Sequence, residues 1–336
     1  MLRSAIHTAK GFVNKHINAL RDETTADNEK QAIAKNVKSF LLSLCQTVII
    51  IGICYMILAP LIGIFSASLF SDRDAYNPMV YLIPQEFTLE RYEKAIEILD
   101  YVPTVIKSLL FSFSLLLLQI LICSMTGYGF ARFNFPFKKL LFGCVVATIM
   151  IPVHTIMLPL YLTFKEFDPL GICTALFGDS VSLMGSPAPI YIMTALGCGL
   201  RSGLYIYIFN QFFRGMPKEI EEAAFVDGAG TWYTYFFIML RNAMPSCITV
   251  AVFSMVWQYN DTFYSVLFMV DEGMAIGVQL QSIIPMISQQ YRIPDKVLQQ
   301  LYLDAGIILM LVPIVLVYVV LQKHFVEGVE RSGIVG

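Results

Sequence analysis

Six apolar segments, each long enough to cross a lipid bilayer as a helix, constrain the fold of this chain more than any other feature. In hydrocarbon, every backbone N–H and C=O group needs an internal partner, which a helix supplies. The chain is only 14% charged, whereas a soluble domain carries about a quarter charged residues. We therefore predict an all-α membrane protein with six transmembrane helices. They lie near 39–66, 106–131, 140–164, 187–213, 244–270 and 302–325.

Lysine and arginine are distributed unevenly between the two sides that six spans define. Fifteen lie in the two termini and in the loops after spans two and four, and seven lie in the remaining loops. Cytoplasmic segments of membrane proteins carry the excess of these residues. Both termini and the loop at 214–243 are therefore predicted to be cytoplasmic. The acidic loop at 71–105 is predicted to be external.

This topology divides the chain into four parts. A cytoplasmic N-terminal arm (1–38) precedes a first transmembrane helix (39–70), an external loop (71–105) and a core of five transmembrane helices (106–336). The net charge of −2 argues against a nucleic-acid partner. The seven cysteines show no CxxC pairing, so we predict packing roles for them and no metal site.

A short polar stretch, EEAAFVDGAG at 221–230, interrupts the apolar sequence between spans four and five. Pro217 and the glutamates after it favour a helix start, and two alanines continue the helix with little side-chain bulk. Gly228 and Gly230 are expected to end it with left-handed backbone geometry. The stretch predicts a short helix with a small-residue face, closed by a glycine turn.

Two roles are open for such a helix on residue pattern alone. Small residues let another protein surface approach closely, and neighbouring acidic groups fix its register through cations on the partner. This favours a docking site for a second protein. The alternative is an amphipathic helix that lies flat on the membrane surface.

The spacing within the loop resembles a known family. Glu222 begins a Glu-Ala-Ala, Gly228 follows, and Ile238-x-Leu240 stands ten residues later. This pattern resembles the EAA loop of ABC importer permeases, in which a proline follows the leucine. Arg241 stands at that position here, and a later proline, Pro245, is kept.

Further blocks of sequence resemble the carbohydrate-uptake type of these permeases, whose best-known member moves maltose. In the last block Asn260 and Asp261 match, whereas Tyr259 stands at the family's Trp and Ser265 at its Pro. The resemblance covers about residues 80–336 and is closest to the second permease of such systems. The blocks are FTLERYEKAI (87–96), GYGFARFNFPFKKLLF (127–142), TIMIPVHTIMLPLYL (148–162) and QYNDTFYSVL (258–267).

The resemblance implies a six-helix type I ABC importer permease in a bacterial-type cytoplasmic membrane, with both termini in the cytoplasm. Its expected partners are a sister permease, two ATPase subunits, an extracellular solute-binding protein, membrane lipid and a sugar. The ATPase subunits bind ATP and Mg²⁺, and this chain needs no cofactor and is no enzyme, since it has no GxxxxGK[ST] phosphate loop. The residues implied in coupling to the ATPase are Glu221, Glu222, Ala223, Ala224, Asp227, Gly228 and Ala229.

Four polar or aromatic residues within the spans are candidates for the translocation path: Arg201, Tyr259, Asn260 and Asp261. A charge within a bilayer costs about 2.5–3.5 kcal/mol on insertion scales and therefore marks an interior or wet face. Aromatic rings and amides also suit a sugar, whose C–H faces stack and whose hydroxyls form hydrogen bonds. A structural pair that holds the helix bundle together is the alternative for both charged residues.

Three other functions compete with a sugar importer. A permease for a polyamine, phosphate or other non-sugar solute would share the same loop. An ion-coupled secondary transporter would show inverted repeats and paired ionisable groups, and we find no repeat. An integral membrane enzyme would need a cluster of catalytic groups, but the four histidines are scattered along the chain.

Overall fold

The computed structural model describes residues 23–270 and 272–333, and these residues form helices and turns. Their only β contacts are two isolated bridges, Phe70–Phe87 and Phe167–Val181. The chain divides into an N-terminal unit, Met1–Gly63, and a larger unit, Ile64–Gly336, which we call the core unit. The predicted all-α class is confirmed for the described residues.

One long helix, α2 (Glu23–Ala67), supplies the described part of the N-terminal unit and ends a few residues inside the core unit. Its apolar part, Lys38–Ala67, has 30 residues, whereas a bilayer needs about 20. The predicted span at 39–66 therefore coincides with a helix. Much of the predicted arm at 1–38 lies outside the described residues, and from Glu23 onward it is the start of α2.

The core unit contains all the other described helices. Three of them (η1, η2 and η4) are 3₁₀-helices, and η3 is a π-helix. In chain order they are α3 (Asp72–Ala75), α4 (Glu90–Ile98), α5 (Tyr101–Arg132), α6 (Lys138–Met150), η1 (Val153–Ile156), α7 (Met157–Lys165), η2 (Pro169–Gly171), α8 (Ile172–Phe177), α9 (Ala188–Ala195), α10 (Ser202–Gly215), α11 (Glu219–Val226), α12 (Thr231–Tyr233), η3 (Thr234–Met239), α13 (Leu240–Asn242), α14 (Met244–Tyr259), α15 (Phe263–Leu267), η4 (Glu272–Met274), α16 (Ile276–Gln281), α17 (Ile283–Gln289) and α18 (Lys296–Gly333).

Three described helices are long and apolar enough to cross a membrane singly: the apolar part of α2, α5, and the part of α18 at Lys296–Val320. Two bent pairs also qualify if each pair is one span. The chain bends by 105° between the helices at Lys138–Met150 and Val153–Lys165, and by 74° between those at Thr231–Asn242 and Met244–Tyr259. By this criterion the described residues hold up to five spans, and the count of six stays a prediction.

The fourth predicted span, 187–213, is two helices and not one. The chain between α9 and α10 takes left-handed backbone at Gly197 (φ 73°) and at Arg201 (φ 59°), which an α-helix cannot accommodate. The fifth predicted span, 244–270, is likewise interrupted, because α14 ends at Tyr259 and α15 begins at Phe263. Apolar length predicted both spans, and it carries no signal for a break of this kind.

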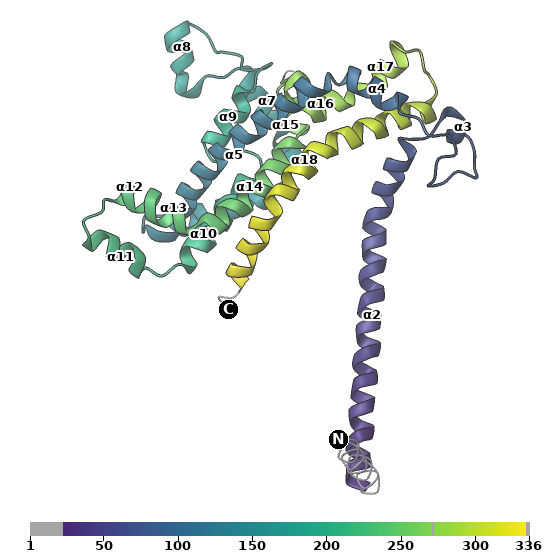
Figure 1. The fold of residues 1–336 in the computed structure, drawn as a ribbon. Helices are drawn as coiled ribbons and strands as arrows, with labels where there is room; N and C mark the ends of the chain where they lie inside the picture. The colour runs from purple at the N-terminus through teal and green to yellow at the C-terminus, as the bar shows by residue number, and fades with distance from the viewer. Residues whose placement is uncertain (1–22, 271, 334–336) are drawn as a thin grey trace, which may run out of the picture. The chain divides into compact units, whose positions relative to one another are not determined.

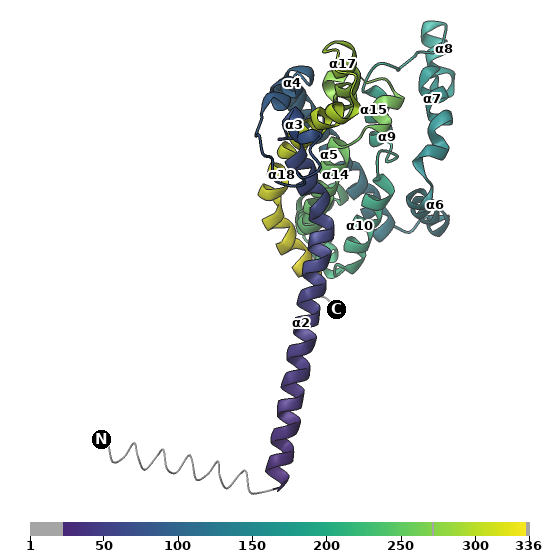
Figure 2. The ribbon, with the colours of Figure 1, turned by 90° about the vertical axis from the view of Figure 1, so that its right-hand side faces the viewer.

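α5 is central to the core unit and packs against α4, α9, α10, α14 and α16. Its closest neighbour is α10, because a small residue lies at their crossing. A Cβ atom added to Gly127 of α5 would lie 2.6 Å from the Cβ of Phe209 and 3.0 Å from the backbone nitrogen of Asn210. Small residues allow such close approach of helices in membranes. α14 in turn packs against both α5 and α18 (Figures 1 and 2).

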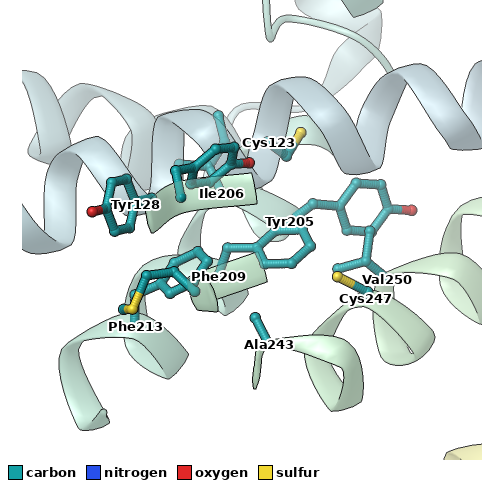
Figure 3. Close-up of a cluster of buried hydrophobic side chains, with 11 residues drawn as sticks. Cys123, Tyr128, Tyr205, Ile206, Phe209, Phe213, Ala243, Cys247 and Val250 are labelled. Carbon is teal, nitrogen blue, oxygen red and sulfur yellow. The ribbon is translucent and has the colours of Figure 1, made fainter. Parts of the chain in front are cut away.

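An aromatic cluster fills the space between α5, α10 and the start of α14 (Figure 3). α5 contributes Cys123 and Tyr128, and α10 contributes four large side chains that include Phe209 and Phe213. Tyr128 meets Phe213 edge-to-face, with ring centroids 5.3 Å apart. Cys123 and Cys247 are buried in this cluster, as the packing role predicted for the cysteines requires, whereas Cys45, Cys54, Cys144 and Cys198 are exposed on this chain. The cluster therefore joins α5 to α10, which leads into α11, and to η3 and α14, which follow α11.

Candidate functional site

α11 is the short polar helix predicted between two apolar segments, and it lies with α12 and α13 at one end of the core unit (Figure 1). At its C-terminal end the N–H of Ala229 donates to the carbonyl oxygen of Ala224 (2.9 Å), and the N–H of Gly228 donates to that of Phe225 (3.1 Å). These two bonds form a Schellman motif, which satisfies the last carbonyl groups of a helix. The predicted helix and its glycine turn are both present.

The two glycines of the turn have different roles. Gly228 has a φ of 83°, a left-handed conformation that favours glycine. A Cβ atom added there would meet nothing within 4 Å, so backbone conformation and not space requires the glycine. Gly230 is extended (φ −75°, ψ 162°), because it precedes α12 as its N-cap residue. The prediction of left-handed geometry is therefore wrong for Gly230.

A buried ion pair fastens α11 to α5. The carboxylate of Glu221 accepts a hydrogen bond from the Tyr128 hydroxyl (2.5 Å) and lies 2.8 Å from Nε of Arg132. The Nε–H does not point along the line to the oxygen, so this contact is an ion pair and not a directed hydrogen bond. Nη2 of Arg132 donates to the carbonyl oxygen of Met216, just before α11 (2.9 Å). One arginine thus holds both the helix and the segment that leads into it.

The other acidic residues of α11 face away from the bundle. Glu222, Ala223 and Asp227 are exposed, whereas Glu221 and Ala224 are buried. The carboxylate of Glu221 is therefore not part of the exposed surface of this chain. An open groove of about 560 Å³ runs along the end of the helix. Its lining residues are Ala224, Asp227, Gly228, Ala229, Gly230, Tyr233 and Ile238.

Exposed aromatic side chains continue this surface, and sequence reasoning did not single them out. Trp232 stacks on Phe236 with ring centroids 6.1 Å apart, and Tyr233 stacks on Phe237 at 4.9 Å. The two stacked pairs reach from α12 into the π-helix η3. Trp232 is 65% exposed. The run WYTYFF at 232–237 was the available signal, because large exposed apolar patches mark interaction surfaces.

The remaining positions of the family pattern follow this aromatic surface. Ile238 lies in η3, and Leu240 begins α13. Arg241, which stands at the family's proline, is exposed within α13, where the backbone stays helical. Pro245 lies in the first turn of α14, the place in a helix that tolerates proline. The bend between α13 and α14 therefore comes before Pro245.

The predicted path residues of the fifth span do not share one surface. The Tyr259 hydroxyl donates to the carbonyl oxygen of Met310 (3.0 Å), so this buried ring faces α18. The carboxylate of Asp261 accepts from the N–H groups of Tyr264 (3.3 Å) and Ser265 (3.1 Å), where α15 begins. Asn260 is exposed at the end of α14. Of these three, only Asn260 lies on an open surface.

Arg201 makes a contact that sequence reasoning missed. Its guanidinium carbon lies 4.3 Å from the centre of the Trp257 ring, in the geometry of a cation–π contact. Trp257 is 42% exposed and stands one turn before Asn260 on α14. The sequence feature that could have indicated this contact is Trp257 itself. It is an aromatic residue in the predicted span 244–270, which also holds the candidates Tyr259, Asn260 and Asp261.

We find no candidate metal site among the residues that the structure describes. Within them, no group of three or more His, Cys, Asp or Glu side chains is arranged to hold a metal ion. The polar groups of α11 instead lie at an exposed helix end, with acidic residues, small residues and an adjoining aromatic surface. This arrangement suits contact with another protein.

Comparisons with known proteins identify the family of the chain. The family model described as "Binding-protein-dependent transport system inner membrane component" matches residues 119–331. A diacetylchitobiose uptake system permease of Streptomyces coelicolor is 25% identical over 277 residues, which cover 82% of this chain and 84% of that protein. An arabinooligosaccharide transport system permease of Halalkalibacterium halodurans is 25% identical over 306 residues, which cover 90% of this chain and 100% of that protein.

A solved structure shares the fold. It is a crystal structure of a bacterial ABC transporter involved in the import of the acidic polysaccharide alginate, and one of its chains superposes with a TM-score of 0.62. The superposition covers 85% of this chain and 96% of that one, at 19% identity, and it therefore concerns the fold alone. Together with the family match, the two relatives confirm the resemblance to carbohydrate-type importer permeases that the EAA loop and the further sequence blocks indicated.

Proposed function

The chain belongs to the binding-protein-dependent transport system inner membrane components, and from that premise we propose that it is a permease subunit of an ATP-driven sugar importer. It pairs with a sister permease, and the translocation path runs between the two. Two separate ATPase subunits bind ATP and Mg²⁺ and dock on the surface around α11. An extracellular solute-binding protein delivers the sugar at the opposite face of the membrane.

The observation that carries this proposal is the way α11 is held. Its inner side is fastened to α5 through the buried pair of Glu221 and Arg132, and its outer side presents Glu222, Ala223 and Asp227. Small residues let an ATPase surface approach the helix closely, and the two exposed carboxylates pair with cations on that surface. An ATPase subunit that binds α11 is therefore connected through this ion pair to α5 as well.

Coupling follows from this attachment. When ATP closes the ATPase dimer, the docked helix moves with the ATPase subunit. Because Arg132 is the last residue of α5 and also binds the carbonyl oxygen of Met216, the movement reaches α5 directly. The movement of α5 then reaches α10 and α14 through the aromatic cluster around Tyr128, because both helices pack against the side chains of this cluster. The permease pair thereby switches between inward-open and outward-open states.

A sugar or oligosaccharide is the proposed solute because of what the relatives carry. The names of two of them specify diacetylchitobiose and arabinooligosaccharides. The proposed location is a bacterial-type cytoplasmic membrane, with α11 and both termini in the cytoplasm. The excess of Lys and Arg in the segments on that side supports this orientation.

The test is purification of the tagged chain from its native membrane in mild detergent, with its companions identified by mass spectrometry. We expect recovery of a second permease and an ATPase. Gly228→Asp should release the ATPase and abolish uptake while leaving insertion intact, because it strains the turn and adds charge to the docking surface. Gly171→Asp is the matched control, since Gly171 (φ 77°) is also left-handed and open but lies between η2 and α8 as the last residue of η2, far from α11 in the fold (Figure 1).

The two variants separate docking from general damage. Loss of the ATPase and of uptake in Gly228→Asp, with both retained in Gly171→Asp, would support the proposal. Recovery of the chain alone, still able to take up solute without ATP, would refute it in favour of a secondary transporter. Equal loss in both variants would mean that strain in the fold, and not docking, is responsible.

A further inference from the structure

Asp261, Asp304 and Arg201 are charged residues within the helices and breaks of the core unit, and both carboxylates accept hydrogen bonds within the chain. Asp261 accepts hydrogen bonds from backbone N–H groups of α15. Asp304 is buried in α18 and accepts a hydrogen bond from Gln300 (2.9 Å). Among the residues that the structure describes, no carboxylate lies within ion-pairing distance of Arg201. No ion pair within the described residues therefore neutralises the charge of Arg201, which is exposed.

The lengths of α10 and α14 indicate how far Arg201 and Trp257 lie from the end of the core unit that holds α11. Arg201 immediately precedes α10, whose 14 residues measure about 21 Å at 1.5 Å per residue, from the end that adjoins α11. Trp257 is 13 residues beyond the start of α14, which places it about 20 Å from the same end. A hydrocarbon core is about 30 Å thick. At this depth an arginine needs water or an anion, because its charge is costly in lipid.

A buried glutamine fixes the positions of Arg201 and Trp257 relative to each other. Nε2 of Gln119 on α5 donates to the carbonyl oxygen of Leu200 (2.6 Å), next to Arg201. Oε1 of the same side chain accepts from the hydroxyl of Ser254 (2.5 Å), one turn before Trp257. Gln119 is fully buried. One amide therefore holds both the break that carries Arg201 and the helix that carries Trp257.

The cation–π contact leaves the hydrogen-bonding groups of Arg201 free. A guanidinium has five N–H donors in a planar fork, which matches the two oxygens of a carboxylate or phosphate. Stacking on a ring uses the face of the guanidinium and not its edge. Trp257, still 42% exposed, has indole surface left for the C–H groups of a sugar. Asn260, one turn further along α14, adds an exposed amide.

We propose that Arg201 and Trp257 form a binding site in the translocation path for an acidic sugar, with the guanidinium on a carboxylate or phosphate of the solute. This inference rests on the proposed importer function and names the class of its substrate. The left-handed backbone at Arg201 and the bridge from Gln119 hold the cation in place before the solute arrives. A neutral sugar would leave the charge of Arg201 unpaired at this depth.

The test uses cells that carry the complete importer, with this chain, its sister permease, its ATPase and its binding protein. ATP-dependent uptake is measured with three radiolabelled probes: digalacturonate for a carboxylate, glucose 6-phosphate for a phosphate, and galactobiose as the neutral disaccharide. The variants are Arg201→Gln, Arg201→Lys, and Lys139→Gln as a control that removes a positive charge from the exposed start of α6. Immunoblots of membranes report whether each variant inserts.

We expect wild-type uptake of at least one anionic probe, and the probe that is transported identifies the anionic group. Arg201→Gln should lower this uptake at least tenfold through a higher KM, Arg201→Lys should lower it less, and Lys139→Gln should leave it within twofold. Wild-type uptake of galactobiose alone would overturn the acidic-sugar site and leave the proposed function standing. An equal loss of anionic and neutral uptake in Arg201→Gln would also overturn it, since Arg201 would then bind a lipid phosphate or support the fold. Absence of any ATP-dependent sugar uptake in wild type would overturn the proposed function itself.

Discussion

Replacing Glu221 with glutamine tests whether the buried ion pair fastens α11 to α5. The side chains of Glu221 and Arg132 are only 9% and 7% exposed, so the variant leaves the charge of Arg132 buried without its partner. Removal of one member of a buried pair costs about 3–5 kcal/mol. The glutamine can still accept from Tyr128, so we expect the lower end, about 3 kcal/mol of unfolding free energy.

The neighbouring glutamate provides the matched control. Glu222→Gln makes the same chemical change one residue further along α11, on an exposed side chain. Its effect on the free energy of unfolding should stay within about 0.5 kcal/mol, as for other surface substitutions. It should nevertheless lower uptake, because Glu222 faces the proposed ATPase. A double variant, Glu221→Gln with Arg132→Met, removes the unpaired charge and should recover at least half of the lost stability.

The assay is unfolding of the purified importer in mixed micelles of mild detergent and sodium dodecyl sulfate, followed by circular dichroism. Uptake by cells is measured in parallel for each variant. If Glu221→Gln and Glu222→Gln lose the same stability, the buried pair does not hold the helix. If the double variant is as unstable as the sum of its two single variants, the two side chains are not coupled and the reasoning fails.

Two further predictions concern the contacts of α5. Gly127→Ala should destabilise the core unit by about 1–3 kcal/mol in the same unfolding assay, because the new Cβ would lie 2.6 Å from the Cβ of Phe209. Gly129→Ala, whose Cβ would meet its nearest neighbour at 4.0 Å, should be tolerated, and equal effects would contradict the close crossing. Gln119→Leu should cost about 2 kcal/mol by leaving the Ser254 hydroxyl and a backbone carbonyl without partners. Unchanged stability and unchanged uptake in this variant would exclude the proposed bridge.

Much of the fold could be predicted from local patterns. Apolar length identified the helices at 39–66 and 106–131, because a span needs a continuous run of apolar residues whatever surrounds it. Alanines followed by glycine identified α11 and its end at Gly228. The spans at 187–213 and 244–270 could not be resolved in this way. Their breaks are stabilised by contacts from other helices, such as the bond from Gln119 to Leu200.

The sequence by itself determined that the chain is an all-α membrane protein and that its polar loop carries an EAA pattern, since both depend on residues close together in the chain. The tertiary structure alone decided which acidic residue of the loop is structural. Glu221 and Glu222 are adjacent and chemically identical, but only Glu221 is turned toward Tyr128 and Arg132 of α5. It also decided that Arg201 meets Trp257, which lies 56 residues further along the chain. Burial and long-range contact depend on how helices pack, and no local pattern encodes them.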